Sequence, residues 1–118
     1  MGGRLDRWVD ALSLIPSHPF GWSSFDFGYA HNLWLDVARN GGWFSFLMSI
    51  LLSVLFVFNF KSALKNNRED ILYLSFIWCL AIGFSALFMV EPIMDGFVYV
   101  FSAFCLFWGV INANYKFN

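Results

Sequence analysis

A histidine and an asparagine, His31 and Asn32, stand side by side shortly before a long apolar stretch. A free imidazole changes charge near physiological pH, so a well-placed histidine can take a proton from a hydroxyl group. In a helix, Asn32, Asp36 and Arg39 would form one polar stripe, since they lie on successive turns. The stretch therefore has two interpretations: a catalytic base with polar support, or a polar stripe that faces water beside a membrane.

Two arginines, Arg4 and Arg7, lie one helical turn apart near the start of the chain. The planar guanidinium group matches the oxygens of a phosphate or diphosphate, which it can bind through two parallel hydrogen bonds. The pair is therefore a candidate anion-binding site. Salt bridges within the segment and contacts with lipid headgroups are the alternatives.

The sequence does not group enough ligands for a metal ion. His18, Asp26 and His31 could contribute to a zinc site, but zinc needs three or four ligands and no paired spacing is present. Cys79 and Cys105 both fall inside apolar runs, where a free cysteine typically acts as a small packed side chain. We expect neither a metal ion nor a cofactor.

The composition is that of a membrane protein. Apolar residues make up 59% of the 118 residues and charged residues only 13%, whereas soluble domains carry about 25% charged residues. A soluble fold this small could not bury so much apolar surface. The net charge of −1 gives no general attraction to nucleic acid, so nucleic acid is not an expected partner.

Three uncharged runs, residues 43–60, 71–90 and 97–111, are candidate membrane spans. About 20 apolar residues in a helix cross the hydrocarbon core, and a helix satisfies its own backbone groups, as lipid requires. The sequence predicts an all-α integral membrane protein in which three transmembrane helices, within residues 43–118, follow a helical segment of residues 1–42. Between the second and third runs, Glu91 and Asp95 are expected to form a solvated turn.

The segment of residues 1–42 is expected to hold two helices joined by a loop. The first helix is amphipathic, because apolar residues recur at helical spacing, and Pro16 and Pro19 end it. The second helix should begin near Tyr29 or Ala30, carry the His-Asn pair and run toward Gly42. The apolar stripe of the first helix consists of Leu5, Trp8, Val9, Leu12 and Ile15.

The distribution of basic residues predicts the orientation. Lys61, Lys65 and Arg68 lie in the first short loop and Lys116 in the tail, whereas the turn of residues 91–96 has no basic residue. Short loops rich in Lys and Arg remain in the cytoplasm. We therefore expect residues 61–70 and the C-terminus on the cytoplasmic side, and residues 1–42 and 91–96 on the opposite side.

The stretches "GRLDRWVDALSLIPSHPFGWSS" and "AHNLWLDVARNGGW" together resemble the conserved C-terminal region of the O-antigen ligase and O-antigen polymerase superfamily. That region contains Gly-Arg, a nearby Trp, an aliphatic helix, His-Pro-x-Gly, His-Asn-x-x-Leu, and a Gly before a transmembrane helix. Asn40 and Ser23 depart from the pattern, which commonly has an acidic residue and a glycine there. The matching positions are Gly3, Arg4, Trp8, Pro19, Gly21, His31, Asn32, Leu35 and Gly42.

The resemblance implies a glycosyltransferase of the bacterial inner membrane that acts in lipopolysaccharide and other surface polysaccharide synthesis. Such an enzyme moves a polyprenyl-diphosphate-linked glycan to a hydroxyl group of a lipid or glycan acceptor, without a metal ion, on the periplasmic face. By motif, Arg4 binds the donor diphosphate, His31 activates the acceptor hydroxyl and Asn32 orients His31. Arg7 is the second arginine of the candidate anion-binding pair.

Members of the superfamily have more spans before this region. The resemblance therefore implies a C-terminal fragment that is inactive in isolation, with a second chain that supplies the remaining spans as an expected partner. The other interpretation is a non-catalytic small membrane protein that assembles with or regulates a larger membrane partner. That protein would tolerate substitution of His31 and Arg4, whereas the transferase would not.

Overall fold

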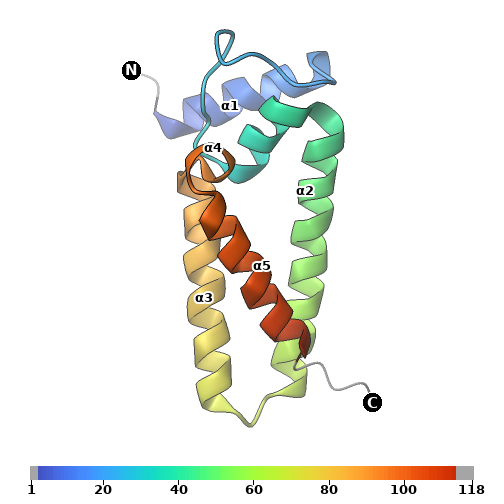
Figure 1. The fold of residues 1–118 in the computed structure, drawn as a ribbon, viewed down its shortest axis with the longest axis vertical. Coiled ribbons are helices and arrows are strands. Elements are labelled where there is room, and N and C mark those ends of the chain that lie inside the picture. The colour runs from blue at the N-terminus through green and yellow to red at the C-terminus, as the bar shows by residue number, and fades with distance from the viewer. Residues whose placement is uncertain (1–2, 114–118) are drawn as a thin grey trace.

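The computed structural model describes residues 3–113, and every regular element in this range is a helix. This confirms the expected all-α class for the described residues. Lys116, which contributes to the expected orientation, lies outside them. The elements are α1 (Arg4–Leu14), the 3-10 turn η1 (Ile15–Ser17), α2 (Leu33–Asn66), α3 (Ile71–Val90), α4 (Ile93–Gly96) and α5 (Val98–Ala113) (Figure 1).

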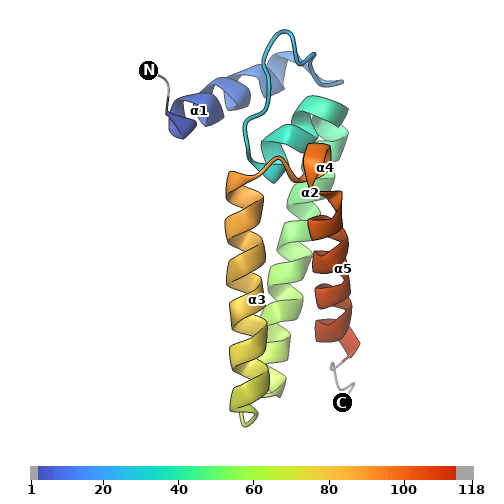
Figure 2. The ribbon, with the colours of Figure 1, turned by 60° about the vertical axis from the view of Figure 1, so that its left-hand side comes forward.

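The part of α2 that follows Gly42 runs beside α3 and α5, and the three form a helical bundle (Figures 1 and 2). By length and composition, α2 and α3 could each cross a membrane, whereas α5 has 16 residues and is shorter. Two of the three predicted spans therefore meet the criterion of length and composition, and the third stays a prediction. The buried residues of the bundle are apolar, and they comprise Phe60, Ala63, Ile77, Ala81, Phe107 and Ile111.

Helix α3 covers the same residues, 71–90, as the second uncharged run. A polar side chain caps its start, and a proline follows its end. The Asp70 side chain caps the start by accepting a hydrogen bond from the Tyr73 amide at 2.9 Å. Glu91 leaves the helical conformation immediately before Pro92, which disfavours helical geometry in the residue that precedes it.

Helix α2 folds back on itself at Gly42. The backbone of Gly42 is not helical (φ 64°, ψ −153°), and the Trp34 indole donates a 2.8 Å hydrogen bond to the Ser53 hydroxyl. In a straight helix these residues would be about 28 Å apart at about 1.5 Å per residue. Residues 33–41 therefore lie over the end of the bundle, where α1 and α4 also lie (Figures 1 and 2).

The expected helix from Tyr29 or Ala30 is wrong at its start, because α2 begins at Leu33. His31 lies outside the helix, and Asn32 is the N-cap residue, whose side chain accepts from the Leu35 amide. Asparagine favours this position because its side-chain oxygen satisfies an amide that has no partner within the helix. The His-Asn pair thus belongs to the turn that enters α2.

Candidate functional site

Two Gly-Trp pairs join the loop after α1 to the fold in α2. The Trp22 amide donates to the Arg39 carbonyl and the Trp43 amide donates to the Pro19 carbonyl, both at 3.0 Å. Gly21 and Gly42 have positive φ values of 89° and 64°. We call this pair of backbone contacts, between residues 19–22 and 39–43, the Gly-Trp clasp.

Glycine is required on both sides of the Gly-Trp clasp. A Cβ atom on Gly21 would collide with the Arg39 carbonyl, and one on Gly42 would collide with the Pro19 carbonyl. Positive φ is also a region that glycine enters at little cost. The clasp therefore explains why glycine stands at both positions, and it fixes the segment that follows His31 against the loop that precedes it.

His31 has an unusual backbone conformation. Its φ is 54°, and among residues 3–113 it is the one non-glycine residue with positive φ. Its side chain is half-buried, and its ring centroid lies 6.3 Å from that of Tyr29. Such a strained conformation persists only where the surrounding structure holds it, and residues of this kind cluster at functional sites. The backbone conformation of His31 therefore marks it as a candidate site residue independently of its side-chain chemistry.

Asp36, in the first turn of α2, is completely buried. Its carboxylate accepts hydrogen bonds from the amide of Ala30 at 2.8 Å and from the amide of Asn32 at 3.1 Å, the residues on either side of His31. Burial raises the pKa of Asp36, and the nearby Asp95 carboxylate adds to the rise, although the two amide bonds and the charge of Arg39 oppose it.

Arg39 links this segment to the far end of the chain. One terminal guanidinium nitrogen lies 2.9 and 3.0 Å from the two carboxylate oxygens of Asp95 in α4. The guanidinium also lies over the Tyr29 ring, 4.8 Å from its centroid. This cation–π contact and the ion pair both hold the arginine in place.

These contacts correct two expectations. Asn32, Asp36 and Arg39 do not form a water-facing stripe, because their exposed fractions are 6%, 0% and 7%. Leu35 and Ala38 pack against α1 and the loop, and Leu33 packs against α3 and α4, so two sides of this short helix are covered. Asp95 does not stand in a fully solvated turn, because its side chain is paired with Arg39 and is 22% exposed.

The two arginines of α1 differ in their placement. Arg7 donates through one terminal nitrogen to the Tyr29 carbonyl at 3.1 Å, and the neighbouring Trp8 indole donates to the Ala30 carbonyl at 3.0 Å. Within residues 3–113, Arg4 is exposed and its side chain forms no hydrogen bond or ion pair. The structure therefore brings Arg7, but not Arg4, against the segment that leads to His31.

One alternative for Arg4 and Arg7 was a salt bridge within their own segment. Neither arginine forms an ion pair with Asp6 or Asp10 in the part of the chain that the structure describes. Asp6 instead accepts from the Gly3 amide at 2.9 Å and so caps the start of α1. The guanidinium donors of Arg7 that do not reach Tyr29 are open to an anion.

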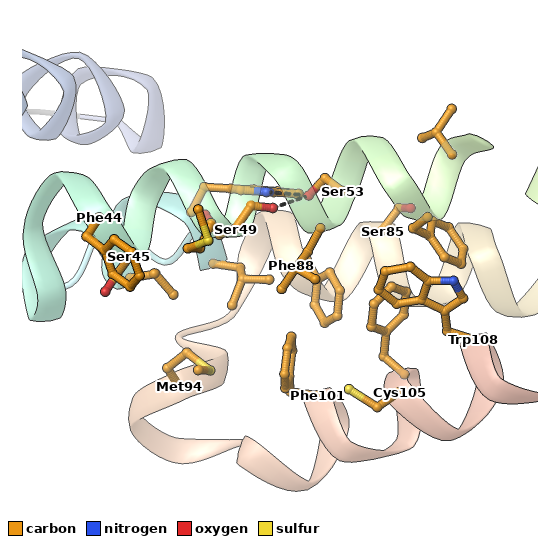
Figure 3. A pocket seen from close by; sticks show the side chains of 18 residues that line it. Phe44, Ser45, Ser49, Ser53, Ser85, Phe88, Met94, Phe101, Cys105 and Trp108 are labelled. Atoms are coloured by element: carbon orange, nitrogen blue, oxygen red, sulfur yellow. Dashed lines mark hydrogen bonds between the residues drawn. The ribbon is translucent and has the colours of Figure 1, made fainter. Parts of the chain in front are cut away.

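An apolar cavity of about 500 Å³ is lined by residues of α2 from both sides of Gly42 and by residues of α3, α4 and α5 (Figure 3). Its lining includes Leu33 and Trp34, two and three residues after His31, and it extends from Phe44 and Ser45 to Trp108 (Figure 3). Ser45, Ser49 and Ser53 line it at intervals of four residues. The remaining lining residues are Val37, Phe44, Met48, Leu52, Phe56, Val57, Ser85, Phe88, Met94, Phe101, Phe104 and Cys105.

Across residues 3–113, no three His, Cys, Asp or Glu side chains are grouped as metal ligands. The ring of His18 is occupied by local contacts, since its Nδ1 lies 2.9 Å from both the Ser17 hydroxyl and the Leu14 carbonyl oxygen. His18 is thus a structural residue of the turn at η1, and it provides an internal reference for His31.

Sequence reasoning placed Asp36 only in a polar stripe and Asp95 only in a solvated turn, and it predicted neither contact that they make in this site. Asp36 had a local signal, since an acidic residue in the first turn of a helix that begins after an asparagine commonly binds free amides there. Asp95 had no such signal, because its partner Arg39 is 56 residues away in the chain. Comparison of the chain with protein families, with curated proteins and with solved structures found no match.

Proposed function

We propose that this chain acts in a membrane glycosyltransferase of the type that the O-antigen ligases and polymerases represent, and that it corresponds to their C-terminal region. The enzyme would transfer a polyprenyl-diphosphate-linked glycan to a hydroxyl acceptor. The observation that carries the proposal is the strained, half-buried His31, whose segment Arg7 contacts at one end of an apolar helical bundle.

The proposed reaction needs a base and a cationic group. His31 accepts the proton of the acceptor hydroxyl while its oxygen forms a bond to the anomeric carbon of the donor sugar. The bond from that carbon to the diphosphate breaks, and the electron pair leaves with the diphosphate. Arginine stabilises the departing negative charge. Arg7 is the better placed of the two arginines, and Arg4, which is also exposed, lies one turn away on the same helix.

The apolar cavity suits the lipid part of such a donor. Most of its lining side chains are apolar, and two of them, Leu33 and Trp34, follow His31 closely in the chain. A polyprenyl tail that entered along α2 would have its diphosphate near the bundle end, where Arg7 and His31 lie.

The same proposal includes a location. We place the bundle in the bacterial inner membrane, with residues 1–42 and 91–96 in the periplasm and the loop of residues 61–70 in the cytoplasm. The support is the basic content of that loop together with the fold, in which α1, residues 33–41 and α4 gather at one end and the loop lies at the other (Figure 1).

The test replaces His31 while preserving its backbone. His31→Asn removes the base, and asparagine tolerates left-handed geometry better than most residues. In the source bacterium, we expect His31→Asn to reduce surface polysaccharide by at least about 100-fold, the scale of general-base catalysis. Arg7→Gln should reduce it more than Arg4→Gln. Polysaccharide is measured by gel electrophoresis of cell-envelope extracts.

His18→Asn is the matched control, because His18 is the other histidine of the chain and its contacts are local. It should leave polysaccharide unchanged, and all four variants should reach the membrane at equal abundance. Normal polysaccharide in both His31→Asn and Arg7→Gln would refute the catalytic assignment.

A second candidate function is supported by one observation. Leu5, Val9 and Leu12 form an exposed apolar stripe on α1, with exposed fractions of 71%, 65% and 52%. Such a stripe, outside the three-helix bundle, suits a non-catalytic protein that assembles with a larger membrane partner. In that case His31→Asn would leave polysaccharide unchanged, whereas Val9→Asp would remove the chain from its complex.

A further inference from the structure

The conformation of His31 requires an explanation beyond its own side chain. A left-handed backbone costs a residue with a Cβ atom about 1–2 kcal/mol relative to the right-handed helix. Glycine would adopt φ 54° at little cost, yet histidine stands there. Interactions from neighbouring residues must therefore hold the backbone of His31 in this state.

The Asp36 carboxylate supplies those interactions from a single point. One oxygen accepts from the Ala30 amide and the other accepts from the Asn32 amide. These amides belong to the residues immediately before and after His31, so the carboxylate fixes the chain on both sides of it. A carboxylate at the start of α2 is also favoured by the positive end of the helix dipole.

The burial of Asp36 shows that this geometry has a cost. The side chain is 0% exposed, and its pKa is raised because the charged form loses contact with water. Arg39 and Asp95 are the other charged groups near it, and they act on Asp36 in opposite directions. The carboxylate's direct hydrogen bonds go to the backbone that flanks His31, and it forms no ion pair of its own within residues 3–113.

We propose that Asp36 is a positioning residue, whose carboxylate holds His31 in its left-handed conformation and so aims the imidazole at the acceptor hydroxyl. The role in transfer rests on the proposed function, whereas the role in holding His31 does not. Asp36 acts through the backbone and does not touch the substrate.

The structural test uses NMR on the full chain in detergent micelles. In the wild-type protein, the Ala30 and Asn32 amide signals should shift together with pH, because one carboxyl group binds both. Their shared midpoint should lie above the usual aspartate range, in the direction of the raised pKa. Independent shifts, or no shift, would overturn the proposal without any substitution.

The variant test is Asp36→Asn, which replaces one acceptor oxygen with a donor and leaves one of the two amides without a partner. The shared titration should disappear and the ring signals of His31 should move, whereas those of His18 should not. Asp10→Asn on the exposed side of α1 is the control, and it should change neither histidine. Unchanged His31 signals in Asp36→Asn would refute the positioning role.

The functional test separates turnover from binding in membranes that contain the complete transferase. We expect Asp36→Asn to lower kcat by about 10- to 100-fold, the scale of a small misplacement of a catalytic group. KM for the lipid-linked donor should change less than about threefold, because Asp36 does not bind it. A rise in KM with unchanged kcat would contradict a positioning role.

The two proposals fail in different ways. If His31→Asn is fully active, the proposed function is wrong, while the NMR result still decides whether Asp36 holds His31. If His31→Asn is inactive and Asp36→Asn keeps the wild-type kcat, the proposed function stands and the positioning role in transfer is wrong.

Discussion

Gly21 and Gly42 matter through the side chains that they lack. Each lies against a carbonyl of the opposite segment and has a positive φ. A methyl group at either position would meet backbone atoms, which cannot rotate away as a flexible side chain can. The separation of residues 19–22 from residues 39–43 is therefore set by direct backbone contact.

We predict that Gly21→Ala and Gly42→Ala each destabilise the protein by about 1–3 kcal/mol, the cost of a strained backbone together with the steric conflict. Gly83→Ala is the control, because a Cβ on Gly83 in α3 meets nothing within 4 Å. Unfolding is followed by circular dichroism in detergent. A loss at Gly83 equal to that at Gly21 would contradict this interpretation of the Gly-Trp clasp.

The candidate residues could be found from the sequence, but their geometry could not. Type and spacing selected His31 together with Arg4 and Arg7, and the motif favoured Arg4, whereas the structure brings Arg7 against the segment that leads to His31. The left-handed backbone of His31 depends on Asp36, which the sequence suggested only as part of a polar stripe. Whether Asp36 faces water or the protein interior depends on what covers residues 33–41, and local pattern does not contain that information.

At the level of elements, α2 and α4 are joined by the pair of Arg39 and Asp95. The Arg39 side chain is 7% exposed and the Asp95 side chain is 22% exposed, and Asp95 as a whole residue is exposed, so the arginine is the shielded partner. Removal of Asp95 leaves the buried Arg39 charge without its partner and therefore costs more than the loss of an exposed pair. The pair fixes residues 33–41 to the turn between α3 and α5.

We predict that Arg39→Met and Asp95→Asn are each destabilising and that their effects are not additive. Residues in direct contact typically have coupling energies of about 0.5–3 kcal/mol in a double-mutant cycle. Asn40→Ala is the matched control, since Asn40 reaches the same Asp95 oxygen from 3.5 Å on the exposed side. Additive effects of Arg39→Met and Asp95→Asn would show that the pair contributes no specific stability.

The elements that the sequence predicted well are those with clear ends. Helix α3 has an uncharged run between Asp70 and Glu91, so its length followed from charge alone. Pro16 similarly marked the end of α1, although a short 3-10 turn follows it. The predicted start of α2 was wrong. The amides of Ala30 and Asn32 donate to the Asp36 carboxylate, and the chain there is not helical.

At the level of the whole molecule, the fold separates the chain into two ends. The candidate site, α1 and α4 lie at one end of the bundle, and the turn after α2 lies at the other (Figure 2). Charge counts alone predicted this division between residues 1–42 and 61–70. The contact of Arg39 with Asp95 agrees with it, since it unites two segments that were expected on the same side.

We predict that the two ends lie on opposite sides of the inner membrane. In a background with Cys79→Ser and Cys105→Ser, a membrane-impermeant thiol reagent should label Ser24→Cys in intact spheroplasts. It should label Glu69→Cys only after the membrane is opened. Ser24 and Glu69 are both exposed, so the comparison is matched for access. Equal labelling of both positions before opening would contradict the orientation.

The hydrogen bonds around His31 also have a consequence for the order of folding. Those that join α1 and η1 to the later chain span 22 or 28 residues, and the Asp36 bonds span four and six. Contacts between residues close in the chain form early, because they close short loops. The surroundings of His31 can therefore assemble during synthesis from about the first 43 residues, before α3 and α5 are made, and the ion pair of Arg39 and Asp95 then completes an already ordered unit.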